Sequence, residues 1–116
     1  MLSTRSQNAI CFLSSLSEFP ENTLVSLQEI TDKEGLPHAY LEQIIPTLKK
    51  AGFVTSHRGA FGGYKLAKPA SKISIWDIVS ILEPQKPSPG KSESIINELY
   101  EITKKHLSKT KLSDIK

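Results

Sequence analysis

The sequence predicts a mainly α-helical fold with one small β-hairpin, and three observations point to it. Apolar residues recur at the three- and four-residue spacing of amphipathic helices in several stretches of the chain. Near the middle, two short stretches rich in strand-forming residues flank a run of glycines. The length of 116 residues suits one hydrophobic core, and 38% apolar with 23% charged residues is ordinary globular composition.

Two helices are expected first. A periodic stretch from about residue 3 to 17 carries its apolar residues on one side. Ser26 and Glu29 then have the spacing of a capping box, which starts a second, short helix. This helix should end near Gly35, because glycine readily adopts the left-handed conformation that stops a helix.

A third helix is expected to begin at Pro37, where a missing N–H costs nothing. Four apolar residues at helical spacing should face the core, namely Leu41, Ile44, Ile45 and Leu48. Pro46 should either bend this helix or displace its first turns outward, because a proline inside a helix removes one hydrogen bond.

The hairpin should follow, with strands at 53–58 and 64–67 around a glycine-rich tip. Ser74 and Asp77 start a fourth helix, with Trp76 in the core. Three prolines and a glycine make residues 83–91 a linker. The last helix, from about 92 to 107, has an apolar seam suited to packing against a partner helix, formed by Ile95, Leu99, Ile102 and His106.

The charge is unevenly distributed along the chain. The formal net charge is only +3, yet no acidic residue occurs between Glu42 and Asp77, an interval that holds six lysine and arginine residues. Such a basic centre indicates a face that attracts a polyanion such as nucleic acid. The alternative interpretation is a solvated lysine-rich surface.

The sequence argues against several classes of protein. Its apolar runs are too short to cross a membrane, and polar residues interrupt the first apolar stretch, which argues against a secretory signal. With a single cysteine and three scattered histidines, we expect no disulfide, metal or other cofactor. The single cysteine and the lack of a signal or membrane segment predict a cytoplasmic protein. No catalytic grouping of serine, histidine and acid stands out, so we do not expect an enzyme.

Three helices followed by a two-stranded hairpin is the order of a winged helix-turn-helix, and a short turn with Gly35 joins the second helix to the third. The third helix would be the recognition helix, with its first residues entering the major groove of DNA. The hairpin would be the wing.

The sequence also resembles a known family. The residues that carry the resemblance are Tyr40-Leu41-Glu42-Gln43, the run 48–54, and Arg58-Gly59 followed by Gly62-Gly63-Tyr64. They are similar to the Rrf2 family of bacterial transcription regulators, which includes IscR, NsrR and CymR. The resemblance implies a homodimeric repressor or activator that binds a two-fold operator, and a dimerisation role for the last helix; of the two, we expect a repressor. Together with the proline-rich segment, this predicts a DNA-binding domain at 1–82, a linker at 83–91, and a dimerisation helix with a tail at 92–116.

Two departures from the family pattern bear on function. The best-known members hold a [2Fe–2S] cluster through three cysteines between the fourth helix and the dimerisation helix. Here residues 83–91 contain no cysteine, and thiolates are the usual ligands of such clusters. We therefore predict a member without an iron–sulfur cluster. Pro37 also replaces a common capping serine, which removes a helix cap.

The recognition helix supplies the candidates for reading bases. Glu42 can accept a hydrogen bond from cytosine N4 in the major groove, and Gln43 can bond adenine. His38 and Ala39 project from the same first turn. Tyr40 can reach a phosphate with its hydroxyl, although packing of its ring is the expected main role. For the other four, the alternative is an ordinary exposed helical side chain.

The wing supplies a second set of candidates. Arg58 suits phosphate or an electronegative minor groove, or else braces the hairpin. The glycines beside it either let the backbone approach DNA closely or serve the turn alone, and these are Gly59, Gly62 and Gly63. Four further cations are expected to contact phosphates without specifying sequence, namely Arg5, Lys49, Lys50 and Lys65.

Other interpretations stay open at this level. Cys11 is interpreted as a small buried hydrophobe rather than a redox sensor, because no basic residue is closer in sequence than Arg5. The regulatory signal is unspecified, and a small molecule or a protein partner could supply it. The competing function is a winged-helix protein-interaction module, in which the basic interval is incidental.

Overall fold

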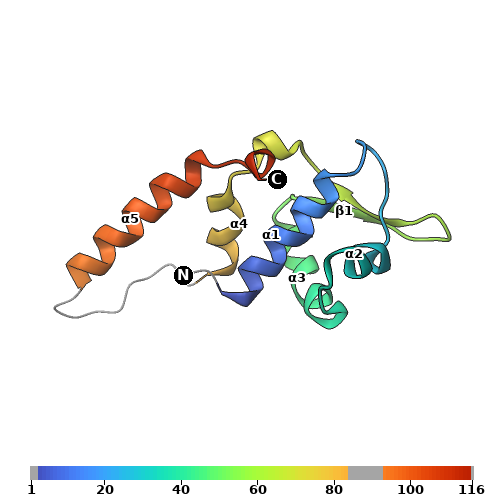
Figure 1. Ribbon diagram of the computed structural model, residues 1–116, viewed down its shortest axis with the longest axis horizontal. Coiled ribbons are helices and arrows are strands. Elements are labelled where there is room, and N and C mark those ends of the chain that lie inside the picture. The colour runs from blue at the N-terminus through green and yellow to red at the C-terminus, as the bar shows by residue number, and fades with distance from the viewer. Residues whose placement is uncertain (1–2, 84–92, 116) are drawn as a thin grey trace.

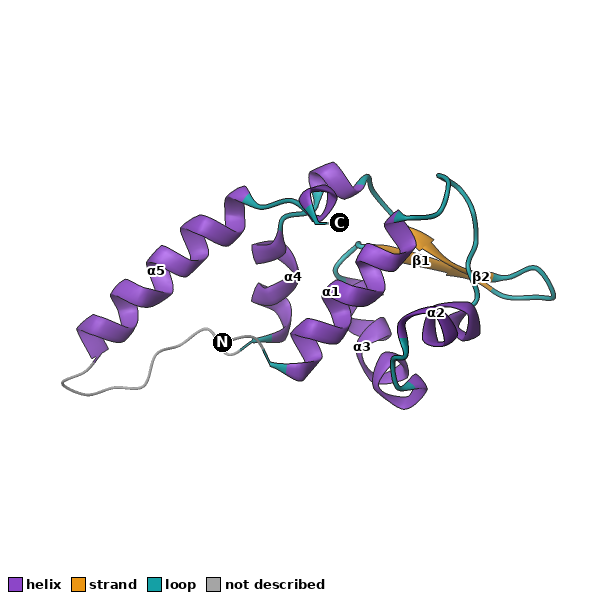
Figure 2. Cartoon of the chain, viewed as in Figure 1, coloured by secondary structure: helices purple, strands orange, loops and turns teal. Residues whose placement is uncertain are grey.

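The computed structural model describes residues 3–83 and 93–115, with the side chains of the last helix described from residue 98 onwards. Its α-helices and strands follow the predicted order (Figure 1, Figure 2), with ends within about two residues of those expected, and two short 3-10 helices, at Ala70–Lys72 and Leu112–Asp114, were not predicted. They are α1 (Thr4–Ser17), α2 (Leu27–Glu34), α3 (His38–Lys50), β1 (Val54–His57), β2 (Gly63–Leu66), η1 (Ala70–Lys72), α4 (Ile75–Leu82), α5 (Glu93–Lys109) and η2 (Leu112–Asp114). The predicted linker lies outside the described residues from position 84 onwards. Within the described ranges, no helix is long and apolar enough to span a bilayer.

Local signals start and stop the helices where the sequence predicts. Ser3, Ser26 and Ser74 are N-caps, and each hydroxyl oxygen accepts a hydrogen bond from a backbone N–H of the first turn. Asp77 completes a capping box with Ser74. Gly35 adopts a φ of +68°, a conformation that costs glycine little, and ends α2.

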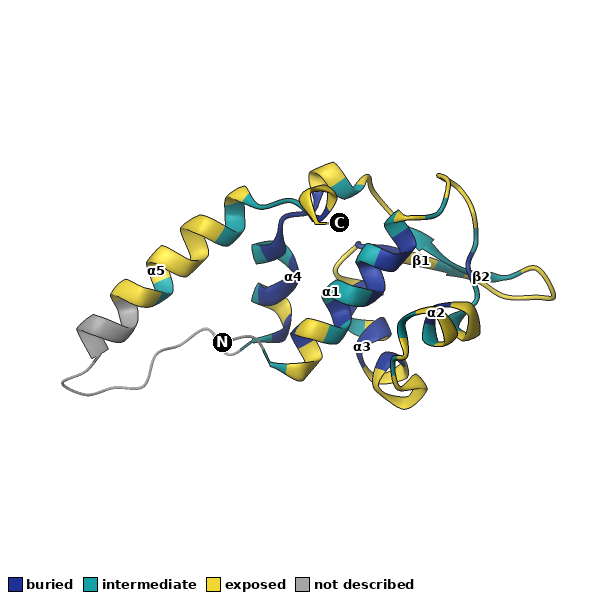
Figure 3. Cartoon of the chain, viewed as in Figure 1, coloured by how far each residue is buried: buried dark blue, intermediate teal, exposed yellow. Residues whose placement is uncertain are grey.

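The apolar faces of α1, α3 and α4 meet in one core, which α2, the hairpin and η2 close (Figure 3). Trp76, predicted to lie in this core, packs against its edge instead of lying inside it. Its side chain is half-buried, and its ring meets that of Tyr100 on α5 edge to face, with centroids 5.4 Å apart. Trp76 occupies the side of α4 that α5 covers. The fully buried large side chains include Phe12, Leu13, Ile30, Leu41, Ile44, Leu48, Ile73, Ile78 and Leu112.

After α5 the chain packs back on residues 73–75, where η1 leads into α4. The N–H of Ile75 donates to the Thr110 carbonyl at 2.8 Å, and the N–H of Leu112 donates to the Ile73 carbonyl at 2.7 Å. The Leu112 side chain is fully buried. The carboxyl end of α5 is therefore fixed to the rest of the fold, Tyr100 holds its middle against Trp76, and its amino end projects away (Figure 1).

A second long-range contact joins the start of α1 to the end of α4. The backbone N–H of Ser3 donates to Glu83 Oε1 at 2.6 Å, across 80 residues of chain. Burial by itself raises the pKa of the Glu83 carboxyl, but hydrogen bonds from Ser3 to the ionised form oppose this and hold the pKa below its usual range.

The lowered pKa of Glu83 predicts a pH-dependent contribution to stability. Such a carboxyl stabilises the fold above its unfolded pKa of about 4.3, and the contribution is lost as pH falls through the lower folded value. The free energy of unfolding should therefore differ most between wild type and Glu83→Gln near neutral pH, and the difference should shrink in acid. Urea denaturation at a series of pH values measures it. If wild type and Glu83→Gln differed in free energy of unfolding by the same amount at neutral and acidic pH, the hydrogen bond from Ser3 to an ionised Glu83 would be contradicted.

Candidate nucleic-acid interface

The outer face of α3 is exposed to solvent. The opposite face packs on α1 and on β1, and Leu41, Ile44, Ile45 and Leu48 are buried there as predicted. Tyr40 is 47% exposed, so the expectation that it mainly packs is not met, because it lies at the edge of the buried face. The other outer residues are exposed as the sequence predicts, and they are His38, Ala39, Glu42, Gln43, Lys49 and Lys50.

Glu42 has a partner on its own helix. His38 Nδ1 lies 2.9 Å from Glu42 Oε1, in an i,i+4 pair on the exposed face. The imidazole engages one carboxylate oxygen, which leaves the other able to accept a hydrogen bond from a base. This pair is not among the predicted contacts, and its sequence signal is the four-residue spacing.

Two prolines shape α3. Pro37 is the N-cap, so the helix begins one residue later than predicted, and no side-chain hydrogen bond caps it. Pro46 lies inside the helix, which continues past it to Lys50. The predicted alternative that Pro46 displaces the first turns outward is wrong, because Leu41 in the first turn is fully buried. Burial of Leu48 in the following turn holds that part of the helix against the core as well.

The wing forms as predicted. Strands β1 and β2 pair antiparallel, with Val54 opposite Leu66 and His57 opposite Gly63. Tyr64 also exchanges two backbone hydrogen bonds, of 2.8 and 2.9 Å, with Val25 in the segment before α2. This bridge, which the sequence pattern does not predict, ties the wing to the helix-turn-helix.

Two glycines at the wing tip, Gly62 and Gly63, leave no room for a side chain. A Cβ on Gly62 would lie 2.2 Å from the His57 carbonyl oxygen, and one on Gly63 would lie 2.6 Å from that of Val25. The N–H of Gly62 also donates to the carbonyl of Gly59 at 3.0 Å, which closes the turn. Gly62 is therefore required by the turn itself, Gly63 by the close approach of Val25, and Gly59 by its positive φ of +118°.

The middle of α3 lies next to the wing. A shallow hollow of about 400 Å³ lies between their side chains, and its lining residues are Glu42, Ile45, Pro46, Lys49 and Tyr64. It brings together a candidate for reading bases, a candidate for contacting phosphate and the strand β2. Base reading and backbone contact can therefore act on one stretch of duplex.

The remaining predicted cations are distributed around this centre. Arg58 is exposed where β1 leads into the tip. Lys65, on β2, is half-buried and its Nζ donates to Asn22 Oδ1 at 3.4 Å. Arg5 is exposed in the first turn of α1, whose start lies away from the wing (Figure 1). The structure thus brings Lys49 beside the wing, turns Lys65 toward the segment before α2, and leaves Arg5 apart from the wing.

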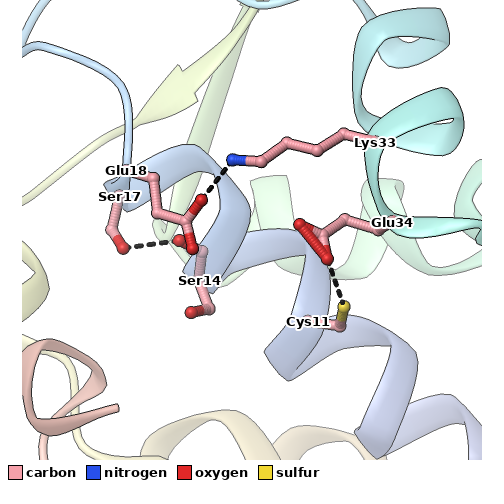
Figure 4. A network of polar contacts seen from close by, with 6 residues as sticks. All are labelled: Cys11, Ser14, Ser17, Glu18, Lys33 and Glu34. Carbon is pink, nitrogen blue, oxygen red and sulfur yellow. Dashed lines mark hydrogen bonds and ion pairs between the residues drawn. The ribbon is translucent and has the colours of Figure 1, made fainter. Parts of the chain in front are cut away.

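Cys11 lies in a polar contact between α1 and α2 (Figure 4). Its thiol donates to Glu34 Oε2 at 3.6 Å, and the side chain is half-buried rather than a buried hydrophobe as predicted, because it faces α2 instead of the core. Burial raises the pKa of the thiol, and the Glu34 carboxylate raises it further. This environment keeps the thiol protonated and agrees with its interpretation as unreactive. Beside it, Lys33 pairs with Glu18.

The apolar seam of α5 is uncovered in the single chain. Leu99 is 54% exposed and Ile102 is 58% exposed, and His106 is exposed on the same helix. The side chain of Ile95 lies outside the described residues. Exposed leucine and isoleucine on a helix that projects from the domain mark a surface that another chain can cover.

Comparisons with known proteins agree with this geometry. A family model described as "Rrf2: Iron-dependent Transcriptional regulator" matches residues 2–116. The chain is 34% identical over 132 aligned residues to the HTH-type transcriptional regulator IscR of Cereibacter sphaeroides, covering 98% of this chain and 85% of that protein.

Solved structures show the same likeness. T. potens IscR superposes with a TM-score of 0.86 at 33% identity, over 99% of this chain and 85% of that chain. CymR, the global cysteine regulator of B. subtilis, superposes with a TM-score of 0.86 at 31% identity, over 99% of this chain and 95% of that chain. On the strength of its sequence and its fold, the chain belongs to the Rrf2 family of transcriptional regulators.

Proposed function

We propose that this protein is a sequence-specific DNA-binding repressor that acts as a homodimer without an iron–sulfur cluster. The observation that carries the proposal is the exposed outer face of α3 beside the wing, in a stretch of sequence that holds cations and no acid between Glu42 and Asp77. The exposed cations of α3 and the wing, Lys49, Lys50 and Arg58, attract the phosphate backbone, and the side chains of α3 can then reach base edges.

The dimer places two such faces on one duplex. The seam on α5 pairs with the seam of a second copy, which buries Leu99 and Ile102. Each α3 then enters a major groove, about one helical turn from the other, and the wings lie in the flanking minor grooves. The operator is therefore an inverted repeat. Repression follows from occupation of the operator, which requires no contact with other proteins.

An iron–sulfur cluster does not fit the residues present. The matching family model is described as iron-dependent, which implies an iron centre. The chain has one cysteine, Cys11, and its thiol is engaged by Glu34 on the opposite side of the α1–α2 contact. Residues 83–91 hold none. Among the described residues, no three His, Cys, Asp or Glu side chains gather where they could share a metal ion. Thiolates are the usual cluster ligands, so the proposed regulator responds to another signal.

Glu42→Ala is expected to relax sequence preference without weakening general binding. Its carboxylate accepts a hydrogen bond from one base, so its loss should reduce discrimination at one base pair of each half-site by about tenfold. Competition binding measures this, with the preferred duplex set against duplexes that differ from it at single base pairs. Nonspecific affinity should stay the same.

The matched control is Glu21→Ala, which removes the same charge from an exposed loop residue outside α3 and the wing. It should leave the preference at every position intact. If Glu42→Ala kept full discrimination at every base pair, or if both variants changed it equally, the assignment of Glu42 to base reading would be wrong.

A further inference from the structure

Phe61 at the tip of the wing is the most exposed large apolar side chain among the described residues, with 93% of its surface accessible. No motif of the sequence and no packing contact of the domain accounts for it. An exposed phenylalanine on a soluble domain marks a contact surface when its position is held by the backbone.

The backbone around Phe61 is held tightly. The hydrogen bond from the Gly62 N–H to the Gly59 carbonyl closes the turn on either side of it. Gly62 also packs so closely on the His57 carbonyl that no Cβ would fit. A phenylalanine ring has only two side-chain torsions, so fixing it in a contact costs little conformational entropy. The tip therefore presents a large apolar group on a constrained support.

The segment that carries Phe61 is basic in sequence. Arg58 is exposed three residues before it, whereas Lys65 on β2 turns its Nζ to Asn22. No acidic residue occurs within fifteen positions of Phe61 on either side. A partner that covers the tip therefore also meets Arg58, which favours a polyanion over a neutral or basic protein surface. Apolar wedges on a basic support are used by proteins that bind the minor groove, where they enter between base pairs and partly unstack them.

We infer that Phe61 is a DNA-contacting residue that enters the minor groove beside Arg58 and wedges into a base step at each outer end of the operator. The inference rests on the proposed function. The ring partly unstacks the step and bends the duplex, and the sugar walls of the groove cover its remaining surface. Flexible pyrimidine–purine steps are then favoured at these two flanking positions, although no hydrogen bond reads them.

The test compares wild type, Phe61→Ala and Phe61→Leu on the duplex that wild type prefers, with 2-aminopurine at the flanking step. Wild type should raise the 2-aminopurine fluorescence, because unstacking relieves its quenching. Phe61→Ala should abolish the rise and weaken binding roughly tenfold, since a base–aromatic contact is lost. Phe61→Leu keeps an apolar wedge and should retain part of both effects. The matched control is Ala60→Ser at the same tip, which should behave as wild type.

Two results would overturn the inference, and only the second would also overturn the proposed function. If wild type binds its preferred duplex and Phe61→Ala binds equally well with the same fluorescence, Phe61 does not contact DNA, while the proposed function stands. If folded wild type prefers no duplex at all, the proposed function fails and the inference fails with it. Thermal unfolding should be unchanged in Phe61→Ala, because so exposed a ring contributes little to the core.

Discussion

Arg58→Ala is expected to weaken binding to every duplex, specific or nonspecific, by roughly tenfold to a hundredfold. Arg58 is exposed where β1 leads into the wing tip, and its guanidinium has the planar shape that suits phosphate and the narrow minor groove. Because a phosphate contact releases bound counterions, the variant should also flatten the plot of log affinity against log salt by about one unit of slope. Fluorescence anisotropy over a range of salt concentrations measures both quantities.

Lys72→Ala provides the matched control for Arg58. It removes the same charge from an exposed residue of η1, which lies on the other side of the domain from α3 (Figure 1). It should change affinity little. If Lys72→Ala and Arg58→Ala weakened binding equally, the effect would come from net charge. If Arg58→Ala instead altered preference at one base pair, as is expected of Glu42→Ala, the division of roles between wing and helix would be wrong.

Leu112→Ala should lower the free energy of unfolding by about 2 to 5 kcal/mol, the range for truncating a fully buried leucine. Leu112 has no exposed surface, and its backbone N–H donates to the Ile73 carbonyl. The variant leaves a cavity at the point where the tail joins α5 to the domain. Urea denaturation measures the loss at a fixed protein concentration, since dimerisation contributes to apparent stability.

Ile115→Ala is the control for Leu112, because Ile115 lies in the same tail but is 37% exposed. Its truncation should cost much less than that of Leu112. If the two variants lowered the free energy of unfolding equally, Leu112 would not anchor the tail in the core. A loss at Leu112 of under about 1 kcal/mol would show the same.

The sequence predicts the helices and the hairpin well because their signals are local. A serine cap, a glycine with positive φ and apolar residues at helical spacing all act within a few positions, and Ser26 and Gly35 bound α2 as expected. Close packing in the turn likewise explains Gly62 at the wing tip, whereas Gly63 is required by the approach of the distant Val25. The caps, the helical periods and the turn need no knowledge of distant residues.

The missed contacts join residues far apart in the sequence. The bridge between Val25 and Tyr64, the hydrogen bond from Ser3 to Glu83 and the burial of Leu112 depend on how finished elements pack. Periodicity carries no such information. Trp76 shows the same limit, because its position on α4 is correct while its burial depends on where α5 lies.

The candidate site was predictable in part for the same reason. The outer residues of α3 follow from the position of its buried face, which a helical period gives directly. The pair of His38 with Glu42 has a local signal in its four-residue spacing. The half-burial of Cys11 against Glu34, by contrast, depends on how α1 packs on α2, which no local pattern determines. Phe61 carries no motif of its own, and only its exposure singles it out.

Dimeric, sequence-specific DNA binding is tested by selecting random duplex DNA with the purified protein in the presence of nonspecific competitor. The protein is first shown to be folded and dimeric by circular dichroism and sedimentation. The expected result is enrichment of an inverted repeat whose half-site centres lie about ten base pairs apart, one turn of the double helix. Failure of the folded dimer to enrich any sequence would contradict sequence-specific binding, and would favour a winged helix that binds proteins instead.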